Sequence, residues 1–434
     1  MLIVSKFGGS SVCDYKQFNN VKNIISNNPL RRVVVVSALG KRFKEDNKIT
    51  DLLYLLSAHI KYNINADHIW ELIYQRYEEI NQTLRLGVDL LKEFDIIKKK
   101  VKEHFDEAYL ISRGEYLTAL LMSVHLGYEF VDSYDLFYFG YDKNINNELS
   151  IEAVNNAVKK FEKIVVPGFY GRGPNGKIHL FSRGGSDVTG AYLSAFLNAS
   201  KYENFTDVPG FLMADPKIIS SPKKIKTINY EELRELSYMG ASVLHEETIL
   251  PLFDTKIPIE ILNTNSPDET GTTITKDSTD SSNLITGIVG KKNYLSITIS
   301  KEKQIDKLKV MISVLALLEK YNVVIEHLPT SIDSFSVIVE RKSIDDVIYD
   351  IIKEIREISG VIDVVIDDDI ALVAVVGRNM ATKPGISGKI FGIVGMANIN
   401  IKMISQGAKE LTIIIGVSNK DFEKTITEIY NKLN

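Results

Sequence analysis

A lysine followed by a glycine loop near the start of the chain is the first arrangement that could do chemistry. Lys6 ends a short apolar run, and Phe7, Gly8, Gly9 and Ser10 follow it directly. Glycines let backbone N–H groups approach an oxyanion closely, and the helix predicted after this loop would favour negative charge at its N-terminus. The pattern predicts a phosphate site, although a plain turn beside a surface lysine has a similar sequence. It is not a Walker A loop, because there the lysine follows the glycines.

A second glycine loop carries an arginine and opens another predicted helix. Arg183 precedes Gly184 and Gly185, and Ser186 and Asp187 follow them. The two loops could face each other across a sheet and divide the anionic groups of two substrates between them. Arginine offers a planar fork that matches a carboxylate, whereas lysine offers a point charge suited to a moving phosphoryl group.

The elements that must position these loops alternate between strands and helices. Val33–Val36 predicts a strand buried on both faces, which is typical of a parallel sheet covered by helices. Ligands bind such sheets at the carboxyl ends of strands, which is where Ser37 lies, although a turn-forming role would also explain it. Ile164–Val166 predicts another buried strand, with Phe169 just after it. On the way to the next helix, Thr50 is predicted to act as the helix cap.

An inserted helical lobe is predicted from about residue 63 to residue 109. Apolar residues recur there at helical spacing, and we expect Trp70 to lie in the core of the lobe. Glu115 follows the lobe, in what reads as the first turn of the next helix, where the helix dipole alone would favour an acidic residue.

Composition and charge exclude several classes of protein. The chain has 52 basic and 56 acidic residues, a net charge of −4 and no long block of one sign, which is unlike a nucleic-acid-binding protein. Its single cysteine, Cys13, excludes an internal disulfide, and we expect it to be a small buried packing residue. The first residues lack a signal-peptide pattern, and no run approaches the ~18 apolar residues of a membrane span. We therefore expect a cytoplasmic protein without nucleic-acid or membrane partners.

An internal repeat occupies the C-terminal part of the chain. Residues 310–339 align with residues 386–415 at one constant offset, which matches Asn322 to Asn398. Each copy reads as helix, strand, short turn and strand. The repeat therefore predicts two units of the same small fold, one after the other.

A polar segment between residues 263 and 283, rich in threonine, serine and aspartate, predicts the linker before the repeats. We expect one domain over 1–283 and a second region over 284–434. Within that region the repeat cores would lie at about 295–345 and 369–434.

Six short motifs follow one another along the chain. They are Lys-Phe-Gly-Gly-Ser-Ser from Lys6, Ser-Arg-Gly-Glu from Ser112, Arg-Gly-Gly-Ser-Asp from Arg183, Thr-Asp-Val-Pro-Gly from Thr206, Ala-Asp-Pro from Ala214 and Gly-Ala-Ser-Val-Leu-His from Gly240. Taken together and in this order, they resemble those of the aspartate kinase family, which has the amino acid kinase fold. The repeats resemble tandem ACT domains, which usually pair their sheets across a dimer and bind amino acids. The resemblance spans the whole chain and implies an α/β protein: a mostly parallel central sheet between helices, an inserted helical lobe and two ACT-like βαββ units.

The resemblance implies an ATP-dependent kinase that uses Mg²⁺ and phosphorylates the β-carboxylate of L-aspartate, the first step toward lysine, threonine, methionine and isoleucine. Lys6 would stabilise the phosphoryl group in transfer, and Asp187 would orient that lysine. Arg183 would hold the α-carboxylate of aspartate and Glu115 its ammonium group. The resemblance names no protein ligand for the metal. The implied substrate-binding residues are Ser37, Thr50, Glu115, Phe169, Arg183 and Ser186. The implied nucleotide-binding residues are Lys6, Phe7, Gly8, Gly9, Ser10, Thr206, Asp207, Leu212, Asp215, Lys217, Ser242 and Val243.

Three of these nucleotide residues depart from the family pattern. Leu212 stands where an aromatic residue is common, Lys217 where an arginine is usual, and Ser242 where a lysine usually follows Gly-Ala. Losing a cation at Ser242 would weaken ATP binding, unless Lys217 and Lys223 compensate for it.

The ACT resemblance implies feedback control by an amino acid, with lysine favoured over threonine. Asp333 would take the effector's side-chain ammonium, although an ordinary turn residue would look the same. Met403–Gly407 would build a homodimer, which could pair again into a dimer of dimers. The implied effector-binding residues are Met311, Ile312, Ser331, Ile332 and Asp333.

Two other functions fit parts of the same pattern. A related kinase acting on another carboxylate, such as glutamate or acetylglutamate, would keep the lysine and glycine loop. A non-catalytic amino-acid sensor would keep the repeats, but it could discard Lys6 or Asp187, and both are present.

Overall fold

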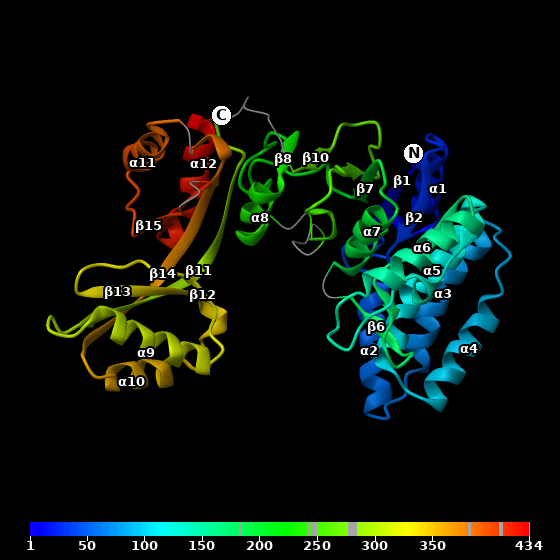
Figure 1. The fold of residues 1–434 in the computed structure, drawn as a ribbon, viewed down its shortest axis with the longest axis horizontal. Coiled ribbons are helices and arrows are strands. Elements are labelled where there is room, and N and C mark those ends of the chain that lie inside the picture. Colours follow the sequence, from blue (N-terminus) through cyan, green and yellow to red (C-terminus); the bar gives the residue numbers. More distant parts are fainter. Residues whose placement is uncertain are drawn as a thin grey trace. The chain divides into compact units, whose positions relative to one another are not determined.

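The chain folds into two compact units. The computed structural model describes residues 1–181, 184–241, 244, 248, 250–276, 284–380, 383–407 and 411–433. The first unit comprises 1–211, 226–230 and 242–278, and the second comprises 212–225, 231–241 and 279–434. Figure 1 labels their helices and strands, and each unit is described below by itself.

The first unit is built on an eight-stranded sheet in the order β3-β4-β2-β1-β7-β9-β10-β8. Pairing is parallel from β3 through β9, while β10 runs antiparallel to β9 and parallel to β8. Val33–Val36 is fully buried, as the sequence predicts for a strand covered by helices. The strands are β1 Ile3–Phe7, β2 Arg31–Val36, β3 Glu129–Phe130, β4 Ile164–Pro167, β7 Lys201–Thr206, β8 Thr227–Asn229, β9 Ile259–Asn263 and β10 Thr272–Thr275; the hairpin β5 Tyr170–Arg172 and β6 Ile178–Leu180 stands apart.

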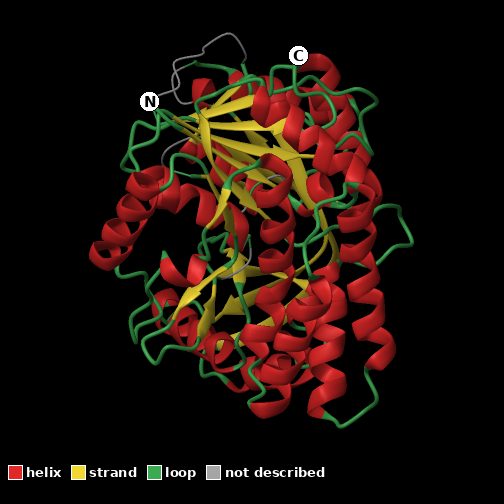
Figure 2. Cartoon of the chain, turned by 90° about the vertical axis from the view of Figure 1, so that its right-hand side faces the viewer, coloured by secondary structure: helices red, strands yellow, loops and turns green. Residues whose placement is uncertain are grey.

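Helices lie on both faces of this sheet. One apolar core contains Phe7, Val34 and Val165 of the strands together with side chains from α1 to α5. Successive residues of a strand point to opposite faces, so Lys6 points away from Phe7 and faces α7, which packs on β1 and β7. Figure 2 shows the long helices packed alongside the strands. The helices are α1 Tyr15–Ser26, α2 Ile49–Lys61, α3 Asp67–Thr83, α4 Leu90–Glu103, α5 Glu107–Leu126, α6 Asn147–Lys160 and α7 Gly185–Phe196.

The inserted helical lobe is present. Helices α3 and α4 fill its predicted range, and Trp70 packs edge-on against Phe94 with ring centroids 6.3 Å apart. Cys13 is buried as expected, and burial, with help from the neighbouring Asp14 charge, raises the pKa of its thiol to about 11. A thiol with such a pKa stays protonated at neutral pH, which fits a packing role.

Two predicted helix starts are wrong. Helix α2 begins at Ile49 after Lys48, and no side chain caps it, so Thr50 lies inside the first turn and is not the cap. Helix α5 begins at Glu107, because Asp106 accepts hydrogen bonds from the first free N–H groups of the helix. Glu115 therefore lies in the middle of α5, and the helix dipole does not explain why an acidic residue stands at this position.

The second unit contains a six-stranded antiparallel sheet in the order β12-β13-β11-β14-β16-β15. Its strands are β11 Gly287–Lys301, β12 Ile325–His327, β13 Ser334–Glu340, β14 Val361–Val376, β15 Met403–Gln406 and β16 Thr412–Val417. Its helices are α9 Lys307–Lys320, α10 Ile348–Glu357, α11 Ile386–Met396 and α12 Phe422–Leu433, and most of α8 Tyr230–Tyr238 also belongs to it.

The two long central strands are shared between the repeats. Strands β11 and β14 pair along their lengths, but β13 pairs with β11 only over Tyr294–Ser300, and β16 pairs with β14 only over Ala371–Val376. The first half of β11 therefore completes the sheet of the second repeat, and the first half of β14 completes that of the first. Each predicted βαββ unit thus gains a second helix and a borrowed fourth strand.

Helices α9 and α11 end in the same way, which supports the sequence alignment of the repeats. Asn322 and Asn398 both adopt left-handed backbone conformations, with φ of 56° and 55°. In each case the following residue, Val323 or Ile399, donates its N–H to a carbonyl in the last turn and is buried. This is the Schellman arrangement, in which asparagine is a common substitute for glycine.

No helix in the part of the chain that the structure describes is long and apolar enough to cross a membrane.

Candidate active site

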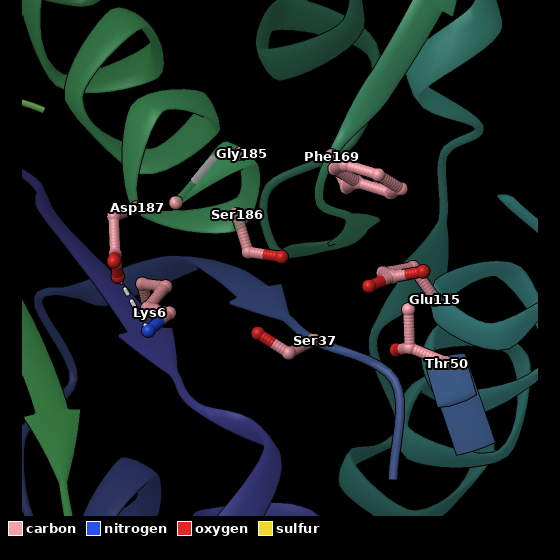
Figure 3. A pocket seen from close by; sticks show the side chains of 9 residues that line it. Lys6, Ser37, Thr50, Glu115, Phe169, Gly185, Ser186 and Asp187 are labelled. Atoms are coloured by element: carbon pink, nitrogen blue, oxygen red, sulfur yellow. Dashed lines mark ion pairs between the residues drawn. The ribbon is translucent and has the colours of Figure 1, made fainter. Parts of the chain in front are cut away.

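A pocket of about 170 Å³ lies at the carboxyl ends of β1 and β2, where Lys6 meets the second glycine loop. It brings together every predicted catalytic and substrate-binding residue except Arg183, which lies outside the described residues. Figure 3 shows Lys6 and Asp187 on one side, Glu115 and Thr50 on the other, and Ser37 between them. The lining residues are Lys6, Ser37, Thr50, Glu115, Phe169, Gly184, Gly185, Ser186 and Asp187.

A buried network fixes the Lys6 ammonium group. Lys6 Nζ lies 2.5 Å from Asp187 Oδ1 and donates to Asn204 Oδ1 at 3.3 Å. Asn204 Nδ2 in turn donates to the same Asp187 oxygen at 2.9 Å. Only 6% of Lys6 is exposed, so its charge needs these partners. The three groups hold the amine in one place at the pocket wall.

Asn204 is the member of this network that sequence reasoning missed. It sits in strand β7, directly beside Lys6 in the parallel register of β1 and β7. The only signal was a polar residue inside an otherwise buried strand. That signal acquires meaning only when the pairing of two distant strands is known.

Two positions of the second glycine loop require glycine for steric reasons. Gly184 has a φ of 76°, which residues with a side chain rarely adopt. It is the N-cap of α7, so Asp187 falls in the first turn of that helix. A Cβ atom on Gly185 would lie 2.4 Å from the Phe169 ring. The glycines therefore let α7 bring Asp187 up to Lys6 while Phe169 stays in the wall.

Phe169 has a strained backbone at the pocket wall. Its φ is 82°, an unfavourable value for an aromatic residue. Its N–H donates to Thr189 Oγ1 at 2.9 Å, and its carbonyl accepts from the Phe181 N–H at 2.8 Å. Strain of this kind persists only where surrounding contacts impose it, and it concentrates at functional sites. The contacts therefore set the position of the ring in the pocket.

Glu115 presents an unsatisfied carboxylate to the pocket. Only 5% of it is exposed, and its Oε2 finds no hydrogen-bond partner among the described residues. Burial raises the pKa of Glu115 to about 7, although backbone N–H groups, including that of Ala38, and the Arg113 charge work the other way. A ligand ammonium group would supply the missing donor and the missing charge. The pocket thus pairs a held cation on one wall with an acceptor for a cation on the other.

The first glycine loop is held by backbone contacts. Gly8 N–H donates to the Phe205 carbonyl at 3.1 Å, and Gly40 N–H donates to the Gly9 carbonyl at 2.9 Å. A Cβ on Gly9 would come within 2.9 Å of the Ala38 carbonyl oxygen, so only glycine fits there. After the loop comes a single 3-10 turn, Gly9–Val12, before α1 begins.

The other predicted nucleotide residues are divided over the chain. Thr206 and Asp207 follow β7 in the first unit, and the Thr206 hydroxyl donates to the Asp207 carboxylate at 3.2 Å. Leu212, Asp215 and Lys217 belong to the second unit, where Asp215 accepts from the Lys217 N–H. Ser242 and Val243, with the helix start expected near them, lie outside the described residues. The described part of the chain holds no group of three or more metal-ligating side chains.

The predicted effector residues lie in the first repeat, but one expectation about them is wrong. Helix α9 begins at Lys307, capped by Asp306, so Met311 and Ile312 are in its second turn and not at its start. Asp333 Oδ1 lies 3.2 Å from the Nζ atom of Lys301, which is only 6% exposed. The neighbours of Asp333 in the turn, Ser331 and Ile332, are exposed.

Comparison with known proteins gives consistent matches over the whole chain. Residues 1–263 match the amino acid kinase family, and residues 373–433 match an ACT domain. Aspartokinase 3 of Bacillus subtilis is 32% identical, over 99% of this chain and 98% of that protein. The lysine-sensitive aspartokinase 3 of Escherichia coli is 25% identical, over 100% of this chain and 99% of that protein. The crystal structure of Clostridium acetobutylicum aspartate kinase is 44% identical, covers 100% of this chain and 99% of that chain, and superposes with a TM-score of 0.93.

The raised pKa of Glu115 makes stability depend on pH. Between its ordinary value of 4.5 and about 7, the folded protein keeps a proton that the unfolded chain has lost. Stability is therefore lost as pH rises through this window. Glu115→Gln removes that loss, so its free energy of unfolding relative to the unchanged protein should rise by roughly 2 kcal/mol from pH 5 to pH 8. Urea denaturation at the two pH values measures the difference.

Glu107 on the same helix provides the control. Hydrogen bonds from Lys61 and Ser57 lower the pKa of Glu107, so it is ionised in both folded and unfolded states across this range. Glu107→Gln should therefore differ from the unchanged protein by the same amount at pH 5 and pH 8. If Glu115→Gln behaved in the same flat way, the carboxyl group of Glu115 would not have the raised pKa.

Proposed function

The chain belongs to the amino acid kinase family and, within it, to the aspartokinases, and on that basis we propose how its pocket works. It transfers the γ-phosphoryl group of ATP to the β-carboxylate of L-aspartate, giving 4-phospho-L-aspartate. The single observation that carries the assignment to this pocket is the held Lys6 ammonium facing an unsatisfied, buried Glu115 carboxylate. One wall suits a phosphoryl group in transfer, and the other suits the ammonium of a free amino acid.

Lys6 neutralises the charge of the phosphoryl group as it moves. Phosphoryl transfer depends mainly on positioning and on electrostatic stabilisation, because the protein has little covalent chemistry to do. Asp187 and Asn204 fix the amine before the substrates arrive, so no reorganisation is needed during the reaction. No general base is required, since the β-carboxylate of aspartate is already ionised at neutral pH.

Aspartate binds across the pocket with its ammonium at Glu115. That interaction replaces the proton that burial favours on the Glu115 carboxyl group, so binding is best above the pKa of about 7. Arg183 holds the α-carboxylate in a two-pronged pair. Ser37 and Thr50 position the β-carboxylate, while Phe169 and Ser186 shape the remaining wall.

ATP enters from the side of the first glycine loop. The first glycine loop, Gly8 to Ser10, faces its phosphates, with the N–H groups of Gly9 and Ser10 as donors because that of Gly8 is bonded to the Phe205 carbonyl. Thr206 and Asp207 contact the nucleotide. Mg²⁺, as the ATP complex, would supply further charge neutralisation, and we assign no protein ligand to it.

The repeats regulate the kinase by binding an end-product amino acid, for which we favour lysine. A relative of similar length is named for its sensitivity to lysine. An effector can shift a conformational equilibrium only by binding its two states differently. Asp333 pairs with the ammonium group of Lys301. If the effector's ammonium group replaced that of Lys301, the two states would bind the effector differently. Strand β15 forms a sheet edge with Ile404 exposed, and we assign it to a homodimer contact.

The decisive test is ATP turnover with the purified protein, trapping any acyl phosphate with hydroxylamine. L-aspartate, L-glutamate and N-acetylglutamate should be compared, each with and without lysine or threonine. We expect hydroxamate with aspartate only, suppressed by lysine. If hydroxamate formed with another acid, that acid would be the substrate in place of aspartate. If none of the three acids gave hydroxamate, the chain would have no catalytic role.

Lys6→Ala should lower kcat by a factor of about 10²–10³ or more, because it removes a preorganised cation from the transition state. The KM for aspartate should change far less, since Lys6 acts on the transferring group. Lys16→Ala is the matched control, because Lys16 is an exposed lysine close by in the sequence. A Lys6→Ala enzyme with near-normal kcat would remove Lys6 from the mechanism.

Asp333→Asn keeps the size of the side chain and removes its charge. It should raise the lysine concentration needed for half-inhibition by about 10-fold, the effect of one charge-assisted hydrogen bond from a half-exposed carboxylate. The comparison variant is Asp345→Asn, an exposed acid of the same repeat paired with Arg341. Unaltered inhibition of Asp333→Asn would move the effector site elsewhere.

A further inference from the structure

A buried arginine in the helical lobe contacts the Ser37–Thr50 loop and the backbone just after the first glycine loop, without lining the pocket itself. Arg76 lies on α3 and is 7% exposed. Its guanidinium group has four acceptors around it. Three of them are the backbone carbonyls of Cys13, Gly40 and Asn47, so these hydrogen bonds fix the backbone itself.

The first pair of contacts joins the start of the Ser37–Thr50 loop, at Gly40, to Cys13, which follows the first glycine loop. Arg76 Nη2 donates to the Gly40 carbonyl at 2.8 Å and to the Cys13 carbonyl at 3.3 Å. Gly40 is bonded in turn to Gly9, and a Cβ on Gly40 would lie 2.5 Å from the Gly9 carbonyl carbon. The two backbones are therefore in direct contact, and moving Gly40 moves the loop that follows Lys6.

The second pair of contacts lies farther along the same loop between Ser37 and Thr50. Arg76 Nη1 donates to the Asn47 carbonyl at 3.1 Å and lies 3.0 Å from Asp46 Oδ2. Burial works against it, but hydrogen bonds from Arg42 and the Arg76 charge lower the pKa of Asp46 to about 2, so the ion pair persists at any physiological pH.

The next residue of the same helix reaches a third wall. Tyr77 is fully buried, and its hydroxyl donates to the Gly114 carbonyl at 2.7 Å, immediately before Glu115. A Cβ on Gly114 would come within 2.8 Å of the Ala38 side chain, so α5 and the loop after β2 touch at this point. Helix α3 thus contacts the backbone next to the first glycine loop, the Ser37–Thr50 loop and the residue before Glu115.

We propose that Arg76 is a positioning residue for the phosphoryl transfer, holding the glycine loop and the Ser37–Thr50 loop at a fixed separation from outside the pocket. The inference rests on the proposed function and extends it to the helical lobe. A guanidinium group suits this task because its planar fork donates in several fixed directions at once, which a lysine amine does not. The two loops carry the two substrates, so their separation is the distance over which the phosphoryl group must pass.

Arg76→Ala should therefore lower kcat by about 10- to 100-fold, because a misplacement of the order of 1 Å costs that much in a positioned reaction. Each KM should stay within about 3-fold of its normal value, since either loop can still bind its own substrate. Arg76→Lys should recover part of the loss. The assay is aspartate-dependent hydroxamate formation by the full chain, expressed per folded molecule from circular dichroism.

Guanidinium rescue separates positioning from simple destabilisation. A cavity of about 150 Å³ lined by Arg76, Arg42 and Asp46 gives a small cation access to the vacated place. About 20 mM guanidinium chloride, far below unfolding concentrations, should raise the kcat of Arg76→Ala, whereas the same concentration of sodium chloride should not. The matched control is Glu79→Ala. It removes the ion pair between Glu79 of α3 and Arg42 of the Ser37–Thr50 loop, and it should change kcat by less than about 2-fold.

The outcomes distinguish this inference from the function beneath it. A kcat of Arg76→Ala within about 3-fold of normal, or a loss that neither guanidinium nor Arg76→Lys relieves, would overturn the positioning role. If the wild-type protein formed no hydroxamate with aspartate, the proposed function would be overturned instead.

Discussion

A buried ammonium group needs a fixed negative partner, and the arrangement of the first unit follows from meeting that need at Lys6. Its partner, Asp187, comes from the first turn of α7, and Asn204 comes from the neighbouring strand. Strand pairing supplies one of these groups and a glycine-capped helix the other. Because the same charge must also meet a substrate, the network satisfies Lys6 on one side and leaves its other side open to the pocket.

The opposite wall follows the reverse principle. Glu115 is buried without a full set of partners, which costs stability in the free protein. Such a cost persists where a ligand later removes it, which is the role we propose for the substrate ammonium. The pocket contains one charge satisfied in advance and one carboxyl group without a full set of partners. Under the proposed function, that asymmetry would set the direction in which an amino acid enters, with its side-chain carboxylate toward Lys6.

Much of the pocket was predictable, because its residues carry their chemistry in the sequence. The glycine loops, the lysine and the arginine in them, and the buried strands are local patterns. Asn204 was not predictable, since its role depends on the register of strands far apart in the chain. Two of the three misplaced helix starts had a local cause: Asp106 and Asp306 cap α5 and α9 several residues before the apolar runs of these helices. At α5 and α9 the capping residue locates the start better than the first apolar turn does, whereas α2 begins without any side-chain cap, so Thr50 was misleading there.

The shared strands of the second unit bear on how such a region could have evolved. A duplicated unit usually remains complete by itself, yet here each copy closes the sheet of the other through β11 and β14. Either copy alone would expose a long unpaired edge, which invites pairing with another chain. Loss of one copy would thus leave an aggregation-prone remnant and not a smaller working domain. We therefore expect descendants of this arrangement to keep both copies or neither, and the region to unfold in a single cooperative step.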